Sequence, residues 1–323
     1  MKVGFTTSFP VEVVFAAGHT PVDMNNLFVL GDSLKLIEIA ELDGYPRNVC
    51  SWIKGMYGVV SQAEIDSVIG IVGGDCSNTH SLMATLKDKG IDVFSFSFPY
   101  NKEKDLLKRE IERLEYHFGV TSKQTYEAKA FLDNIRKKLI EADRLTWETG
   151  QITGAENHIN LVCASDFNGD PVEYEKKIDE LLLKAKERPA DNKSLRMGFI
   201  GVPPIFTDLY DVLENCDIKI VFNEIQRQFA MPYLEKDIVD QYLKFTYPYS
   251  VFDRLKDINL NIEKRKIDGI LNYTQAFCHR QIDAVLLKKY IEKPVLSIEG
   301  DQPDKTDART ILRLESFIDM LEY

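Results

Sequence analysis

Residues 267–301 read IDGILNYTQAFCHRQIDAVLLKKYIEKPVLSIEGD, and their pattern predicts one complete strand–loop–helix–strand unit. An apolar run at 270–273 ends in a loop that carries Cys278. A segment with apolar residues near helical spacing follows, and a second apolar run at 295–298 stops abruptly at polar residues. Ligands of open α/β sheets bind beyond the carboxyl ends of the strands. The thiol of Cys278 is therefore predicted to lie where such proteins bind their ligands.

The same unit occurs a second time, earlier in the chain. Residues 68–98 read VIGIVGGDCSNTHSLMATLKDKGIDVFSFSF, with an apolar run, a loop that carries Cys76, a helical segment and a second apolar run. The two copies are too divergent to be a sequence repeat, but they share one architecture. The sequence therefore predicts an α/β protein made of two similar parallel-sheet halves.

The length of 323 residues suits two domains. We expect an N-terminal α/β lobe with a long helical segment over 1–155, an interdomain strand–helix–linker over 156–196 and a C-terminal α/β lobe over 197–323. The apolar run 159–163 is predicted to be a strand, which makes Cys163 a buried structural thiol. The first strand of the C-terminal lobe has no GxGxxG loop after it, so a dinucleotide site is not supported.

The composition limits the classes of binding partner and the cellular location that we expect for the chain. The chain is 44% hydrophobic and 28% charged, with a net charge of −11. This acidic balance argues against nucleic acid or an anionic membrane as a partner. No signal peptide is recognised and no apolar stretch of about 18 residues occurs, so we expect no membrane span and a cytoplasmic location.

Five cysteines are scattered along the chain, which in a reducing compartment does not indicate a disulfide framework. Cys163 lies within an apolar run and Cys216 just past a helix, and both are interpreted as structural. The other three are each predicted at a strand end or a helix start: Cys50, Cys76 and Cys278. For Cys50, the predicted helix start favours a thiolate. Thiolates select zinc or iron–sulfur clusters. Because the spacing matches no compact metal motif, three unrelated thiols remain an alternative.

The order of the segments resembles the 2-hydroxyacyl-CoA dehydratase and benzoyl-CoA reductase family of iron–sulfur proteins, of the D-component type. The resemblance covers most of the chain. It rests on FPVEVVFAAGHTPVDM (9–24), RNVCSWIKG (47–55), GIVGGDCSNTH (70–80), ASDFNGDPVEYEKKIDELL (164–182), VLSIEGDQPD (295–304) and TILRLESFIDML (310–321).

The resemblance implies two flavodoxin-like, Rossmann-like lobes with additional helices and a cluster in a cleft between them. The cluster ligands carry over to Cys50, Cys76 and Cys278, and the cluster is a 4Fe-4S cube or a double-cubane 8Fe-9S cluster. The family implies an oxygen-sensitive, anaerobic dimer, either of identical chains or with a paralogous subunit. An ATP-hydrolysing iron–sulfur activator supplies low-potential electrons. An acyl-CoA is a possible substrate, and the reaction is a dehydration (a lyase) or a reduction (an oxidoreductase).

Three polar residues are expected nearest the predicted cluster loops and are catalytic candidates. Glu12 could shuttle protons, or could simply favour the dipole of its helix. Ser51 could donate a hydrogen bond to a cluster sulfur, or could cap its helix. Gln275 is the third. Alternatives of other classes stay open: a double-cubane reductase of small molecules, a metal-free two-lobed binding protein, and a cluster-carrying electron-transfer or assembly protein.

Overall fold

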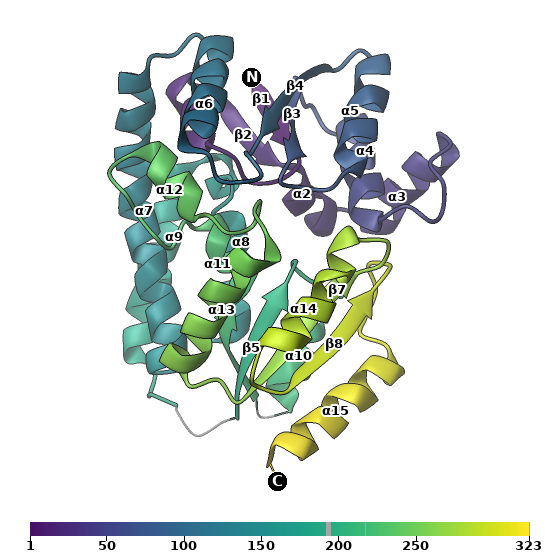
Figure 1. Ribbon diagram of the computed structural model, residues 1–323, viewed down its shortest axis with the longest axis vertical. Helices are drawn as coiled ribbons and strands as arrows, with labels where there is room; N and C mark the ends of the chain where they lie inside the picture. Colours follow the sequence, from purple (N-terminus) through teal and green to yellow (C-terminus); the bar gives the residue numbers. More distant parts are fainter. Residues whose placement is uncertain (192–194, 217, 323) are drawn as a thin grey trace. The chain divides into compact units, whose positions relative to one another are not determined.

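Two four-stranded parallel sheets form the framework of the chain in this computed structural model (Figure 1). The structure describes residues 1–191, 195–216 and 218–322. Each sheet belongs to one compact unit. The first unit comprises Met1–Lys137, Cys163–Lys176 and Phe229–Ser250. The second comprises Lys138–Val162, Lys177–Gln228 and Val251–Tyr323. The domain boundaries expected from the sequence stay predictions.

The sheet of the first unit has the strand order β2-β1-β3-β4. The strands are β1 (Lys2–Phe5), β2 (Thr20–Asp23), β3 (Ser67–Gly73) and β4 (Asp92–Ser97). Helices α4 and α5 lie on one side of this sheet and α6 on the other (Figure 1). The central strand β3 is buried over most of its length, as an apolar strand between two helical layers must be. A Cβ on Gly70 of that strand would lie 2.0 Å from the sulfur of Met83, so a glycine lets α5 approach closely.

Most helices that contribute to the first unit lie wholly within it. They are α1 (Val11–Ala16), α2 (Met24–Leu30), α3 (Ser33–Leu42), α4 (Ser51–Gln62), α5 (Asn78–Asp88), α6 (Lys104–Phe118), η1 (Phe167–Gly169) and α12 (Ile238–Lys244). Two long helices, α7 (Ser122–Glu148) and α9 (Pro171–Glu187), contribute residues to both units. The chain therefore returns to the first unit twice after leaving it.

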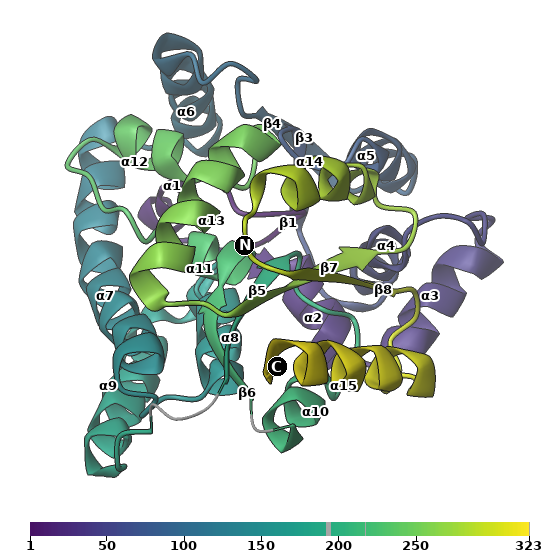
Figure 2. The ribbon, with the colours of Figure 1, turned by 60° about the horizontal axis from the view of Figure 1, so that its bottom comes forward.

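The sheet of the second unit has the order β6-β5-β7-β8. Its strands are β5 (Leu195–Gly201), β6 (Ile218–Asn223), β7 (Gly269–Gln275) and β8 (Val295–Gly300). Its helices are α8 (Gly154–Cys163), α10 (Leu209–Asn215), α11 (Glu224–Phe229), α13 (Val251–Arg265), η2 (His279–Gln281), α14 (Asp283–Tyr290) and α15 (Ala308–Glu322). The last residues of α8 and α11 belong to the first unit. Helices α13 and α14 cover one face and α10 and α15 the other (Figure 2).

The observed architecture confirms the predicted fold class. Both units are parallel sheets flanked by helices, the flavodoxin-like arrangement, and both strand–Cys–helix–strand units form as expected. Within the part of the chain that is described, no helix combines the length and the apolar character needed to cross a bilayer.

The strand predicted at 159–163 is wrong, because these residues form the end of α8. A reciprocal capping box starts that helix: the Thr153 amide donates to Glu156 Oε2 at 3.0 Å, and the Glu156 amide donates to Thr153 Oγ1 at 3.2 Å. A short apolar run cannot by itself separate a strand from a buried helix. The capping signal, which lies six residues before the run, decides the structure. Cys163 is half-buried at the helix end.

Candidate functional site

The loop that carries Cys76 begins where β3 ends, at the carboxyl edge of the first sheet. The Phe98 amide donates to the Gly73 carbonyl at 3.0 Å, and the Thr79 amide donates to the Cys76 carbonyl at 3.0 Å. Gly74 has a φ of +94°, which only glycine adopts without strain. A half-buried thiol is thereby held between a strand end and the first turn of α5.

Cys50 is the N-cap residue of α4 in the same unit, as the sequence predicts. Its carbonyl accepts hydrogen bonds from the amides of Ile53 and Lys54, and the residue is 7% exposed. Ser51 is the first helical residue and is completely buried. One turn on, the buried ammonium of Lys54 lies 2.7 Å from Glu41 and holds the pKa of that carboxyl below its ordinary value. The helix start places positive potential near the cysteine.

Cys278 lies beyond the carboxyl end of β7 in the second unit. Phe277 before it has a φ of +62°, a strained value for a residue with a side chain. The Cys278 amide donates to the Gln275 carbonyl at 3.1 Å, and the Gln281 amide donates to the Cys278 carbonyl at 3.1 Å. Cys278 therefore caps η2 in the way that Cys50 caps α4.

A small cavity of about 10 Å³ adjoins Cys278, with room for roughly one water molecule. Two arginines line it, Arg254 and Arg280, and Arg254 is 2% exposed. The Arg254 guanidinium donates to both oxygens of the buried Glu224 carboxylate, at 2.7 and 2.9 Å, and to Asp283 at 3.1 Å. The Gly201 amide donates to the same Glu224 carboxylate at 2.9 Å. These bonds fix the wall of the cavity and compensate the buried charges.

Gln275, a predicted catalytic residue, is 1% exposed and also lines this cavity. Its side-chain oxygen accepts from the Tyr273 hydroxyl at 2.9 Å, and its amide donates to the Asp301 carbonyl at 2.8 Å. The same hydroxyl accepts from the Ile205 amide at 3.0 Å. These contacts tie the ends of β7 and β8 together. They support a structural role, and the catalytic role of Gln275 stays a prediction.

Glu12, another catalytic candidate, is completely buried at the start of α1. Its carboxylate accepts from the Arg136 guanidinium at 2.7 Å and from the Tyr242 hydroxyl at 2.8 Å. Tyr242 also donates to the Phe9 carbonyl at 2.8 Å. Glu12 thus joins α7 and α12 to the start of α1 within the first unit. Its use as a proton shuttle stays a prediction, as does a role for Ser51 in catalysis.

The three thiols singled out by the sequence each lie at the start of a helical segment. A family model described as 2-hydroxyglutaryl-CoA dehydratase, D-component, matches residues 6–321. The chain belongs to this family. A search of curated proteins finds no match. Membership makes the chain a component of the dehydratase type, and it confirms the resemblance recognised from the sequence.

The described residues contain no group of three His, Cys, Asp or Glu side chains placed to hold a metal ion. The buried hydroxyls of Ser8, in the loop after β1, and of Thr79, in the first turn of α5, have no hydrogen-bond partner. A buried hydroxyl without a hydrogen-bond partner destabilises the fold, and a bound group that accepts a hydrogen bond from it removes this penalty. Neither hydroxyl was predicted from the sequence, although Thr79 follows Cys76 by three positions.

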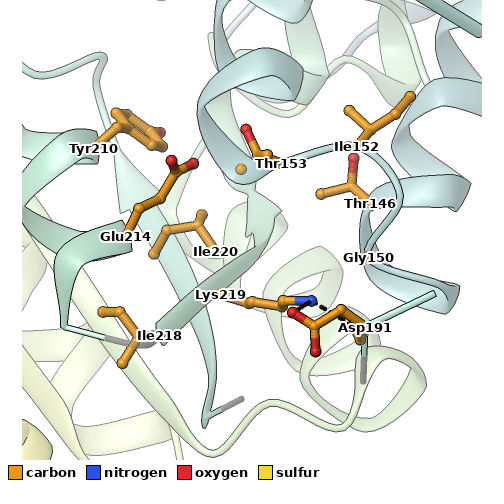
Figure 3. Close-up of a pocket in the computed structure, with 11 residues that line it drawn as sticks. Thr146, Gly150, Ile152, Thr153, Asp191, Tyr210, Glu214, Ile218, Lys219 and Ile220 are labelled. Atoms are coloured by element: carbon orange, nitrogen blue, oxygen red, sulfur yellow. Dashed lines mark hydrogen bonds and ion pairs between the residues drawn. The ribbon is translucent and has the colours of Figure 1, made fainter. Parts of the chain in front are cut away.

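The second unit has a larger cavity of about 220 Å³ (Figure 3), which Cys278 does not line. It opens at the amino end of β6, beside Ile218 and Lys219, whereas Cys278 follows the carboxyl end of β7 in the same parallel sheet. Lys219 points across the cavity to Asp191, with which it forms an ion pair of 2.6 Å. This cavity therefore does not belong to the thiol-bearing edge of the sheet.

Proposed function

We propose that the chain is the iron–sulfur component of a 2-hydroxyacyl-CoA dehydratase-type enzyme, with a cluster held by Cys50, Cys76 and Cys278. It receives low-potential electrons from an ATP-hydrolysing iron–sulfur activator, and it dehydrates or reduces its substrate. One observation carries the proposal: in a member of this family, three cysteines each occupy the start of a helical segment, and two of them follow a parallel strand. Parallel sheets bind ligands at that edge.

The donor set fits an iron–sulfur cluster. Thiolates are the usual protein ligands of these clusters, and three of them leave one iron of a cube for another ligand. When bound, such a cluster supplies single low-potential electrons and an iron that a substrate can reach. The starts of α4 and α5 favour the negative charge of the thiolates through the helix dipole. The orphaned hydroxyls of Ser8 and Thr79 are donors available to an anionic group.

The partners follow from the same proposal. A dimer, formed by identical chains or with a paralogous subunit, and a separate activator complete the enzyme. An acyl-CoA is the proposed substrate. No residue of the chain is assigned to any of these partners.

The proposal is tested by counting iron and sulfide per chain in protein purified without oxygen, together with electron paramagnetic resonance spectra. We expect bound iron, and a single cube and a double-cubane cluster differ in the count. Cys→Ser variants at positions 50, 76 and 278 should each lose iron and visible absorbance. Cys163→Ser and Cys216→Ser serve as matched controls and should keep both. Iron-free wild-type protein, or equal loss in the controls, would refute the proposal.

Activity is a second test. Iron-loaded protein, activator, ATP and a low-potential reductant are incubated with a 2-hydroxyacyl-CoA, and the products are identified. An unsaturated acyl-CoA indicates dehydration, whereas net consumption of reductant indicates reduction. No turnover with an intact cluster and a competent activator would overturn the enzymatic part of the proposal.

A further inference from the structure

Residues 245–250, with the sequence FTYPYS, lie against the loop that carries Cys76. Both segments belong to the first unit. The Tyr247 hydroxyl donates to Asp75 Oδ1 at 3.0 Å, and Tyr247 is 8% exposed. A Cβ on Gly74 would lie 2.5 Å from the Cβ of Pro248 and 2.8 Å from its carbonyl oxygen. The two residues directly before Cys76 are thus both covered by this segment.

The FTYPYS segment is itself firmly held. The rings of Phe245 and Tyr247 stack at 6.1 Å, and Phe98 packs edge-on against Phe245 and Tyr249. The Lys102 ammonium lies 4.7 Å from the ring centroid of Tyr249. Aromatic packing of this kind adds to the stabilisation that burial provides. A segment so fixed can hold a neighbouring loop in one position.

The anchor of this segment is the buried network around Glu12. The segment follows α12, whose Tyr242 donates to the Glu12 carboxylate at 2.8 Å, and Arg136 pairs with that carboxylate at 2.7 Å. The Tyr249 hydroxyl donates back to the Tyr242 carbonyl at 3.3 Å. A continuous series of contacts therefore runs from Glu12 through α12 and Tyr247 to Asp75, the residue before Cys76.

We propose that Tyr247 is a positioning residue that holds the Cys76 loop through its hydrogen bond to Asp75. The significance of that role rests on the proposed function, in which Cys76 is a cluster ligand. The loop needs such support because Gly73 and Gly74 give its backbone wide conformational freedom. A bond to the carboxylate of Asp75 acts one residue from the thiol. Tyr247 itself touches no reacting atom.

The test uses iron-free, full-length protein and the alkylation rate of each cysteine, measured by mass spectrometry of the labelled peptides. Alkylation of a half-buried thiol depends on local opening of its loop. We expect Tyr247→Phe to speed labelling of Cys76 about tenfold, which corresponds to about 1.4 kcal/mol. Labelling of Cys50 and Cys278 should change less than about twofold. Tyr57→Phe is the matched control, since it removes a 2.7 Å Tyr–Asp hydrogen bond to Asp43 that does not involve α12.

The partner residue supplies a second set of variants. Asp75→Asn keeps an acceptor oxygen and should preserve slow labelling, whereas Asp75→Ala should accelerate it. Adding Tyr247→Phe to Asp75→Ala should then give less than about a twofold further increase, because the bond is already lost. Equal acceleration at every cysteine in Tyr247→Phe, or full additivity in the double variant, would overturn the proposed role. Because these measurements need no iron, they decide the role of Tyr247 even if the iron count refutes the cluster.

Discussion

Replacing Asp23 with asparagine removes one of two buried carboxyl groups that interact in the first unit. The Asp23 amide donates to Asp166 Oδ2 at 2.8 Å, and each residue is 5% exposed. Burial raises the pKa of Asp166 from 3.8 to about 7, with a further contribution from the charge of Asp23. Burial also raises the pKa of Asp23, although hydrogen bonds from Ser165 and Asn25 offset part of this effect.

These pKa shifts determine whether the free energy of unfolding rises or falls with pH. Between about pH 4 and pH 7 the folded chain keeps a proton on Asp166 that the unfolded chain has lost. The free energy of unfolding therefore falls as pH rises through this window and stays low above it. A shift of about three units corresponds to roughly 4 kcal/mol, of which burial accounts for the larger share. We expect Asp23→Asn to raise the free energy of unfolding by about 1–2 kcal/mol at pH 8 and to leave it nearly unchanged at pH 4.

The assay is urea unfolding of wild type and variant at several pH values, followed by circular dichroism. The asparagine oxygen can still accept the two hydrogen bonds that Asn25 donates to Asp23 Oδ1, so the cap of α2 is preserved. Asp32→Asn is the control, because Asp32 also caps a helix but is exposed. Parallel pH profiles for wild type and Asp23→Asn would show that the two carboxyls do not interact, and the argument would fail.

Other substitutions test the residues that surround Cys76 and Cys278. Gly74→Ala should lower the free energy of unfolding by about 2–4 kcal/mol in a denaturant titration, since it adds both backbone strain and a clash with Pro248. Arg254→Met should lower the free energy of unfolding by about 3–5 kcal/mol in the same titration, because it leaves the buried Glu224 carboxylate without its cationic partner. Adding Glu224→Gln should restore part of that loss. Thr79→Val should change the stability of iron-free protein by less than about 1 kcal/mol, because its hydroxyl has no partner there. If the hydroxyl serves a bound cluster, the same variant should alter the electron paramagnetic resonance spectrum of iron-loaded protein.

The fold was predictable because its signals are local. Continuous apolar runs such as those of β3 and β7 are typical of parallel strands covered on both faces, and glycines or polar residues mark where they end. The placement of the three thiols at helix starts followed from the same signals. Helix α8 was mistaken for a strand because a run of five apolar-rich residues is compatible with both structures, and its capping box lies outside the run.

The supports of the site were not predictable, because they depend on which distant segments meet. Tyr247 and Asp75 are 172 positions apart, and the FTYPYS segment has neither helical nor strand periodicity. Glu12 was read as an acid on a helix face, but burial and the Arg136 guanidinium make it part of a buried network. Burying an ionised carboxylate destabilises the fold unless a partner compensates its charge, and no local pattern names a partner over 120 residues away. Sequence patterns therefore locate the thiols, whereas the contacts that hold the Cys76 loop follow from the return of residues 229–250 to the first unit.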